Sequence, residues 1–150
     1  MNKKIVYIDL DGVLANFQKG VGRKVDRFER PNEMLQRGFY ANLEVLDGSY
    51  KAICELLLSD KLDIYIASKP TIYNPYCMSE KYEWVYKHFP ELIKKVNLVC
   101  DKGLLKGDFL IDDSTRWHGK FEGQCLKFDP DNSKFSWDCI IKFFNSRNLL

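Results

Sequence analysis

The chain of 150 residues contains only two histidines, and its five cysteines never form a Cys-x-x-Cys pair. His88 and His118 lack the paired spacing of zinc ligands, so we do not expect a zinc site. Cys54, Cys100 and Cys139 lie in apolar segments. Since free cysteines are among the most buried residues and persist where thiols stay reduced, these positions predict buried thiols in a reducing compartment.

Long apolar runs are also missing. No run approaches the ~20 residues that a membrane-spanning helix needs. The apolar stretch near the amino terminus stops at Asp9, which is too short for the core of a signal peptide. Lysine and arginine are scattered, the net charge is only +2, and no stripe for nucleic acid is visible. We therefore expect a cytoplasmic protein that binds neither a membrane nor a nucleic-acid polymer.

Short apolar runs, in contrast, recur along the chain. Runs of this kind predict strands buried on both faces, and they lie at 5–8, 62–67, 96–99, 109–111 and, as a late strand, 125–128. Helices are predicted between and after them at 50–59, 80–89 and 135–144. Strands that alternate with helices predict an α/β fold with a mainly parallel, Rossmann-like sheet flanked by helices. A length of 150 residues suits one domain, 1–150.

The segment after the first strand predicts a small cap. Residues 13–29 carry apolar side chains, among them Phe28, at helical spacing, and Pro31 interrupts the pattern. A short helical piece follows around 33–37. We expect these pieces to form a small helical cap, at about 16–45, over the carboxyl edge of the sheet.

Polar residues follow four of the predicted strands. They are the acid pair Asp9 and Asp11, then Ser68, then Lys102, and finally the acid pair Asp112 and Asp113. The carboxyl ends of parallel strands converge on one edge, which is where open α/β sheets bind ligands. Neighbouring carboxylates repel one another unless a cation or a proton joins them. A divalent metal would resolve that cost and prepare the site for phosphate chemistry.

This ordered set resembles the four motifs of the haloacid dehalogenase (HAD) superfamily, over about residues 4–145. Smaller pieces look like the 5'(3')-deoxyribonucleotidase family, which removes phosphate from deoxynucleoside monophosphates with Mg²⁺. Those pieces are Asp9–Phe17, Gly38-Phe39, Glu80–Val85, Asp101-Lys102 and Leu110–Asp113. The resemblance implies a HAD-like fold and a Mg²⁺-dependent phosphoric monoester hydrolase that acts on a nucleoside monophosphate.

The resemblance also implies roles for the acids. Asp9 would be the nucleophile that forms an aspartyl-phosphate, and Asp11 the general acid and base. Mg²⁺ would be held by the Asp9 carboxylate, the Asp11 backbone carbonyl and Asp113, with Asp112 in support. The reverse assignment of Asp112 and Asp113 stays open.

Phosphate binding would fall to a hydroxyl and several lysines. Ser68 would donate a hydrogen bond to the phosphate, and Lys102 would offset the developing charge. Lys81 is a second candidate cation, although a lysine on a helix can equally be solvated. Cys100 stands where the family often has Arg, and Lys69 stands where it usually has a second Ser. Lys69 would replace the charge lost at position 100.

Aromatic residues predict the rest of the pocket. Phe17, Phe39 and Tyr40 could stack on a base or line the sugar site, although Phe17 could also belong to the core. Only 21 residues separate Phe17 from Phe39, far fewer than in the animal enzymes, so the cap is reduced. We expect structural roles for the tryptophans at positions 84, 117 and 137, and for His118.

Three alternatives remain. A phosphatase of another small metabolite, such as a sugar phosphate, would use the same motifs. A receiver-like signalling module also combines acids, a hydroxyl and a lysine, but its phosphorylated aspartate precedes the hydroxyl and the lysine. Here the adjacent acid pair follows Lys102, so the order argues against a receiver. A non-catalytic phosphate-binding protein is the third alternative, and the complete set of acids argues against it.

Overall fold

The computed structural model describes residues 2–26, 29–114 and 120–150. Five parallel strands form one sheet in the order β3-β2-β1-β4-β5. The strands are β1 (Lys4–Ile8), β2 (Leu62–Ser68), β3 (Val96–Leu98), β4 (Phe109–Asp112) and β5 (Gln124–Lys127). The predicted α/β fold is confirmed, because apolar runs flanked by polar residues mark each strand to within about one residue.

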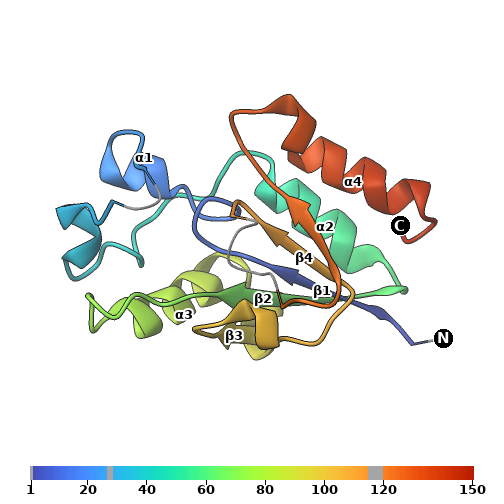
Figure 1. The fold of residues 1–150 in the computed structure, drawn as a ribbon, viewed down its shortest axis with the longest axis horizontal. Coiled ribbons are helices and arrows are strands. Elements are labelled where there is room, and N and C mark those ends of the chain that lie inside the picture. Colours follow the sequence, from blue (N-terminus) through green and yellow to red (C-terminus); the bar gives the residue numbers. More distant parts are fainter. Residues whose placement is uncertain (1, 27–28, 115–119) are drawn as a thin grey trace.

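The helices of the described chain are α1 (Phe17–Val21), α2 (Ser49–Leu58), α3 (Cys77–His88) and α4 (Trp137–Ser146). The last three each contribute buried residues to the main core, which covers one face of the sheet (Figure 1). Successive side chains of β1 point to opposite faces of the sheet. Val6 and Ile8 belong to this core, whereas Tyr7 packs against Leu110 and Phe121 on the other face.

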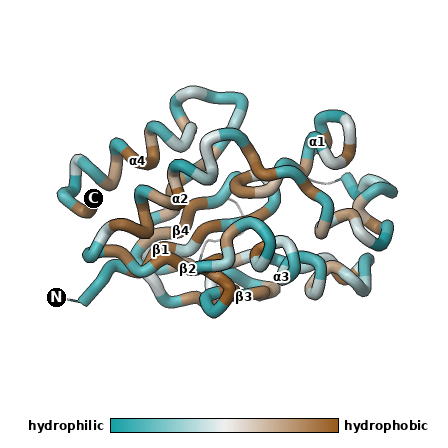
Figure 2. The backbone as a smooth tube through the Cα atoms, turned by 180° about the vertical axis from the view of Figure 1, so that it is seen from behind, coloured by the Kyte–Doolittle hydropathy of each residue, from teal (hydrophilic) through white to brown (hydrophobic). Residues whose placement is uncertain are grey.

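The central strands are the most apolar part of the chain, as the hydropathy colours show (Figure 2). Trp84 and Trp137 are buried in the main core, as expected. The five cysteines are free, but the prediction for three of them is wrong: Cys54 and Cys100 are exposed, and Cys139 is only partly buried. Trp117 and His118 lie outside the described residues. Among the described helices, none has the length and apolarity to cross a membrane.

The prediction of a helix over 13–29 is wrong for most of that range. The chain turns immediately after β1, because Leu10 O accepts hydrogen bonds from the N–H groups of residues 13, 14 and 15. Helix α1 then lasts five residues and ends at Gly22, whose φ of +82° is left-handed. Phe28 lies outside the described residues. The second predicted helical piece is a 3₁₀ helix, Asn32–Leu35.

Candidate active site

The carboxyl edge of the sheet gathers the polar residues that follow the strands. Asp9 comes directly after β1, and its N–H donates to Ile111 O of β4 at 3.0 Å. Ser68 ends β2, while Asp112 ends β4 and Asp113 follows it. The predicted convergence of these side chains at one edge therefore occurs, since parallel neighbours run in register to the same edge.

Lys102 lies between two of the acids. Its Nζ is 2.7 Å from Asp9 Oδ1 and 2.6 Å from Asp112 Oδ2, and the lysine side chain is only 6% exposed. Burial alone would lower the pKa of Lys102, but the two carboxylates outweigh it and raise that pKa. Lys102 starts a short 3₁₀ helix capped by Asp101, which accepts from Gly103 N at 2.9 Å. Lys102 is thus a cation beside Asp9.

Three carboxylates at this edge have the geometry of a cation site. Oxygen atoms of Asp9, Asp112 and Asp113 lie within 4.8 Å of one another. Burial and the neighbouring carboxylates raise the pKa of Asp9, even against the opposing effect of Lys102. The pKa of Asp113 is raised in the same way, because its carboxyl group is desolvated although the residue as a whole is exposed. These are the signs of excess negative charge that a metal would neutralise.

The two acids of the later pair differ in their partners. Asp112 accepts from Lys102 through Oδ2 and from the Ser114 N–H through Oδ1, at 2.6 and 2.8 Å. For Asp113, residues 2–26, 29–114 and 120–150 supply no ion pair. A hard oxygen-ligand site of this kind suits Mg²⁺.

Gly12 makes room for Asp113. Its φ of +79° lies in the left-handed region that glycine favours. A Cβ at position 12 would lie 2.4 Å from Asp113 Oδ2, closer than any real contact allows. The turn after β1 therefore needs glycine both for its backbone and for the approach of this carboxylate.

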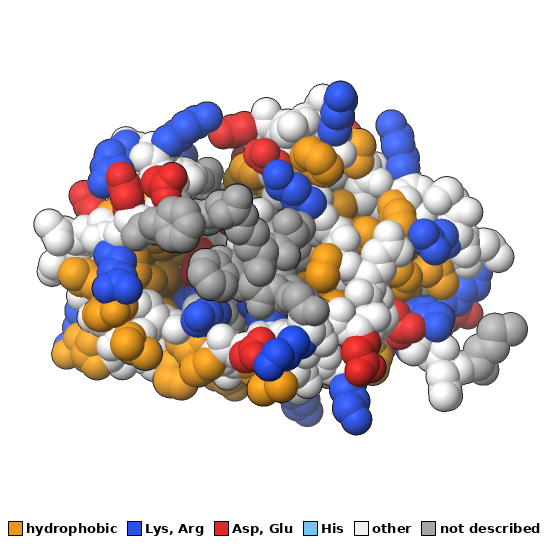
Figure 3. Space-filling model, in the orientation of Figure 1, with side chains coloured by type: hydrophobic (Ala, Val, Ile, Leu, Met, Phe, Trp, Pro, Cys, Tyr) orange, Lys and Arg blue, Asp and Glu red, His pale blue; other side chains and the backbone are white. Residues whose placement is uncertain are grey.

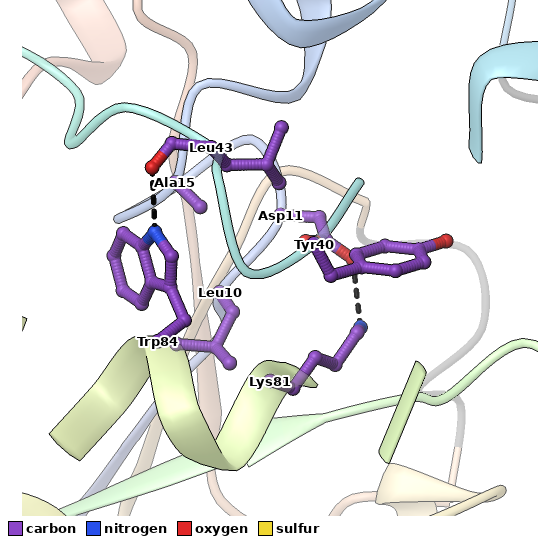
Figure 4. A pocket seen from close by; sticks show the side chains of 7 residues that line it. All are labelled: Leu10, Asp11, Ala15, Tyr40, Leu43, Lys81 and Trp84. Atoms are coloured by element: carbon purple, nitrogen blue, oxygen red, sulfur yellow. Dashed lines mark hydrogen bonds and ion pairs between the residues drawn. The ribbon is translucent and has the colours of Figure 1, made fainter. Parts of the chain in front are cut away.

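Lys81 forms a second buried cation centre at the same edge (Figure 4). Its Nζ lies 2.7 Å from Asp11 Oδ2, and it donates to Ser68 Oγ at 2.7 Å and to the Lys69 carbonyl at 3.0 Å. The side chain is 2% exposed, so the solvated alternative for Lys81 is wrong. An ammonium has three protons, and all three have acceptors here. Lys69 itself is exposed and contributes its carbonyl to this centre.

The predicted pocket aromatics form one cluster beside Lys81. The ring centres of Phe17 and Phe39 are 5.4 Å apart, and those of Phe39 and Tyr40 are 5.1 Å apart. Phe17 and Phe39 are partly buried, whereas Tyr40 is buried with its ring centre 5.1 Å from Lys81 Nζ. The cluster thus borders the small pocket of Figure 4, whose lining includes Asp11, Tyr40 and Lys81.

The sequence analysis missed several buried polar residues around this edge. Glu80, next to Lys81, accepts hydrogen bonds from the N–H groups of Gly38 and Tyr40. Asn74 donates to the carbonyls of Met34 and Gln36. Two adjacent charged residues on a predicted helix indicate a face exposed to solvent, so helical spacing did not predict the burial of Glu80. The only signal was that Glu80 belongs to a segment that looks like the deoxyribonucleotidase family.

Comparisons with known proteins agree with this geometry. The family model described as "5' nucleotidase, deoxy (Pyrimidine), cytosolic type C protein" matches residues 26–141, which excludes the first acid pair. The human cytosolic 5'(3')-deoxyribonucleotidase is 28% identical over 78% of this chain and 74% of its own length. The mouse mitochondrial enzyme of that name is 32% identical over 72% of this chain. The chain covers 63% of the mouse protein, less than two thirds.

Solved structures with little sequence similarity share the fold. The HAD-hydrolase YfnB from Bacillus subtilis, solved with magnesium bound, superimposes with a TM-score of 0.66 at 11% identity over 97% of this chain. A haloacid dehalogenase-like hydrolase from Xanthomonas campestris gives a TM-score of 0.55 at 10% identity. The fold, the acid-rich edge and the family match lead to one conclusion: the chain belongs to the family described as deoxy (pyrimidine) 5' nucleotidase, cytosolic type C, and it shares the fold of HAD hydrolases.

Proposed function

We propose that this protein is a Mg²⁺-dependent 5'(3')-deoxyribonucleotidase that works through an aspartyl-phosphate. The observation that carries the proposal is the arrangement around Asp9, which has Lys102 at 2.7 Å and the carboxylates of Asp112 and Asp113 close by. The names of the human and mouse relatives supply the nucleotide substrate. The family membership supplies the reaction class.

Asp9 attacks phosphorus in this mechanism. An enzyme carboxylate that displaces the nucleoside oxygen divides one hard displacement into two easier ones. Lys102 holds Asp9 Oδ1 and orients the carboxylate, which leaves Oδ2 for the attack. Mg²⁺, held by the carboxylates of Asp9 and Asp113 and by the Asp11 carbonyl, would offset the charge of the acids and of the substrate phosphate when bound. Asp112 supports the site through its contacts with Lys102 and the Ser114 N–H.

Asp11 serves as the general acid and then as the base. It protonates the leaving ester oxygen in the first half-reaction and accepts a proton from the attacking water in the second. Lys81 holds its Oδ2 at 2.7 Å, which fixes the orientation of the carboxylate. A poor, basic leaving group such as a nucleoside alkoxide needs this proton, and the acid therefore suits a nucleotide ester.

The phosphate oxygens are held by Ser68 and by lysines. Ser68 Oγ lies at the end of β2 and would donate to the phosphate. Lys81 would exchange one of its present acceptors, which are Asp11, Ser68 and the Lys69 carbonyl, for a phosphate oxygen. Lys102 offsets the charge that develops in the transition state. Lys69 is exposed beside Ser68, and its ammonium replaces the charge that Cys100 does not provide.

The substrate is a small phosphate monoester rather than a nucleic-acid polymer. Phe17, Phe39 and Tyr40 form the wall that contacts the sugar and the base. In this proposal residues 1–150 form a single hydrolase domain, and the segment at about 16–45 is a reduced cap. The name of the human cytosolic relative supports a cytoplasmic location.

A phosphate-release screen tests the function directly. Pyrimidine deoxynucleoside 5'- and 3'-monophosphates, the matching ribonucleotides and a set of sugar phosphates are compared with Mg²⁺ and with EDTA. We expect the highest kcat/KM with a deoxynucleotide and no turnover in EDTA. Preference for a sugar phosphate would instead identify a phosphatase of another metabolite. A complete lack of turnover would favour the receiver-like or non-catalytic alternative.

A further inference from the structure

Three buried side chains fasten the cap to the segment that carries Lys81. Asn74 donates to the carbonyls of Met34 and Gln36, at 2.9 and 3.1 Å. Glu80 accepts from two cap amides, and Trp84 Nε1 donates to Leu43 O at 2.7 Å (Figure 4). The hydrogen-bond partners follow the same order along both segments, so the contacts form a continuous seam between the cap and residues 74–84, which include most of α3.

Two cation–π contacts also join the two segments at the outer end of this seam. Arg30 lies 4.2 Å from the ring centre of Tyr73, and Arg37 lies 4.9 Å from that of Tyr76. Figure 3 shows hydrophobic side chains gathered at this end of the molecule. Tyr73 and Tyr76 are among the exposed hydrophobic residues there. Each cation–π contact at an exposed site is weak, so the buried contacts set the position of the cap.

Glu80 is the centre of the seam. Its Oε1 accepts from Gly38 N at 2.6 Å and its Oε2 from Tyr40 N at 3.1 Å, and the residue is 5% exposed. Those two amides flank Phe39. The surrounding backbone forms turns, so its N–H groups need partners outside a helix or a strand. A buried carboxylate is costly unless it is hydrogen-bonded, and two backbone donors satisfy it here.

The next residue on α3 is Lys81, which contacts Asp11 and Ser68 at the catalytic edge. Successive side chains of a helix point in directions about 100° apart, so one turn of α3 contacts both the cap and the sheet edge. We propose that Glu80 is a positioning residue for specificity, one that fixes the aromatic wall of Phe39 and Tyr40 relative to Lys81. The inference rests on the proposed nucleotidase function.

The wall can assist only a substrate that has a sugar and a base to contact it. Acetyl phosphate carries the reacting phosphate but no ring, so it reports on the catalytic edge alone. Glu80→Gln keeps the size of the side chain but replaces one acceptor oxygen by a donor, which would face an N–H group. Glu83→Gln is the matched control, because Glu83 is exposed on the same helix.

We expect Glu80→Gln to raise KM for the best deoxynucleotide by about tenfold or more, as the loss of a charge-assisted hydrogen bond implies. Its kcat and KM for acetyl phosphate should stay within about threefold, since the chemistry at the edge is untouched. Hydrogen exchange at the Gly38 and Tyr40 amides should speed up in this variant. Glu83→Gln should behave as the unsubstituted protein in both assays.

Equal losses on both substrates would overturn the inference, because Glu80 would then merely support the fold. An unchanged KM for the nucleotide, or unchanged exchange at the two amides, would overturn it as well. If Glu80→Gln fails to fold, Glu80→Asp, which keeps both acceptor oxygens, should show a smaller KM effect of the same kind. Turnover of acetyl phosphate but of no nucleotide would refute the proposed substrate instead, and amide exchange would still decide whether Glu80 holds the cap.

Discussion

Replacing Gly12 by alanine should weaken Mg²⁺ binding as well as destabilise the fold. Alanine in the left-handed conformation costs about 1–2 kcal/mol. The added Cβ would also lie 2.4 Å from Asp113 Oδ2, so that oxygen must retreat by about 1.0 Å to reach an ordinary contact at 3.4 Å. Metal–ligand distances tolerate only about 0.2 Å. The Asp113 ligand is therefore lost or strained, and we expect the Mg²⁺ concentration for half-maximal activity to rise on the order of 10–100-fold.

Gly22→Ala separates the two effects. Gly22 has nearly the same φ, +82°, but its Cβ would meet nothing within 4 Å. Both variants should lose about 1–2 kcal/mol, which for a domain of this size lowers the Tm by roughly 2–8 °C. Only Gly12→Ala should shift the Mg²⁺ titration, measured by phosphate release at saturating substrate. Equal Mg²⁺ titrations for the two variants would refute the assignment of Asp113 to the metal.

The remaining predictions concern the acids, the lysines and pH. Asp113→Asn should raise the Mg²⁺ requirement more than Asp112→Asn does in a metal titration; a larger effect at Asp112 would reverse their roles. Lys81→Met should raise KM by about tenfold or more, and intact substrate affinity in Lys69→Ala would eliminate Lys69 as a phosphate ligand. Because the pKa of Asp113 is raised to about 9, this carboxyl group holds its proton in the folded, metal-free protein but not in the unfolded chain between about pH 4 and 9. Thermal unfolding in EDTA should therefore show that the free energy of unfolding falls between about pH 5 and 8, by at most ~1.4 kcal/mol per pH unit for each such acid. Added Mg²⁺, or the substitution Asp113→Asn, should make the free energy of unfolding less dependent on pH. A free energy of unfolding that rises with pH in EDTA would contradict this prediction.

The strands and the catalytic edge could be predicted from the sequence because one physical rule governs both. A strand buried on both faces must be apolar throughout, and it stops where a polar side chain reaches the edge. Asp9, Ser68 and Asp112 mark such stops, so their convergence followed from a parallel sheet. The same rule could not predict which of Asp112 and Asp113 would bind the metal. Its two members differ by contacts with Lys102 and the Ser114 N–H, which depend on the tertiary fold.

The segment proposed as a cap could not be predicted at the same level. Apolar residues at helical spacing favoured one long helix, but Gly22 in a left-handed conformation ends α1 after five residues. The cap is held by long-range contacts from Glu80 and Asn74 to its backbone rather than by its own helices. Local patterns carry no information on such partners. Burial of Lys81 has the same origin, since it depends on the cap and the sheet meeting at α3.

The central claim, that Asp9 is the nucleophile, can be tested by trapping the covalent intermediate. The protein is mixed with the best deoxynucleotide and Mg²⁺, quenched in acid and reduced with borohydride, which converts an aspartyl-phosphate to homoserine. Peptide mass mapping then identifies the modified position. The account predicts homoserine at position 9, lost in Asp9→Asn, and no conversion at Asp11, Asp112 or Asp113. Homoserine at one of those acids, or turnover without any conversion, would contradict it.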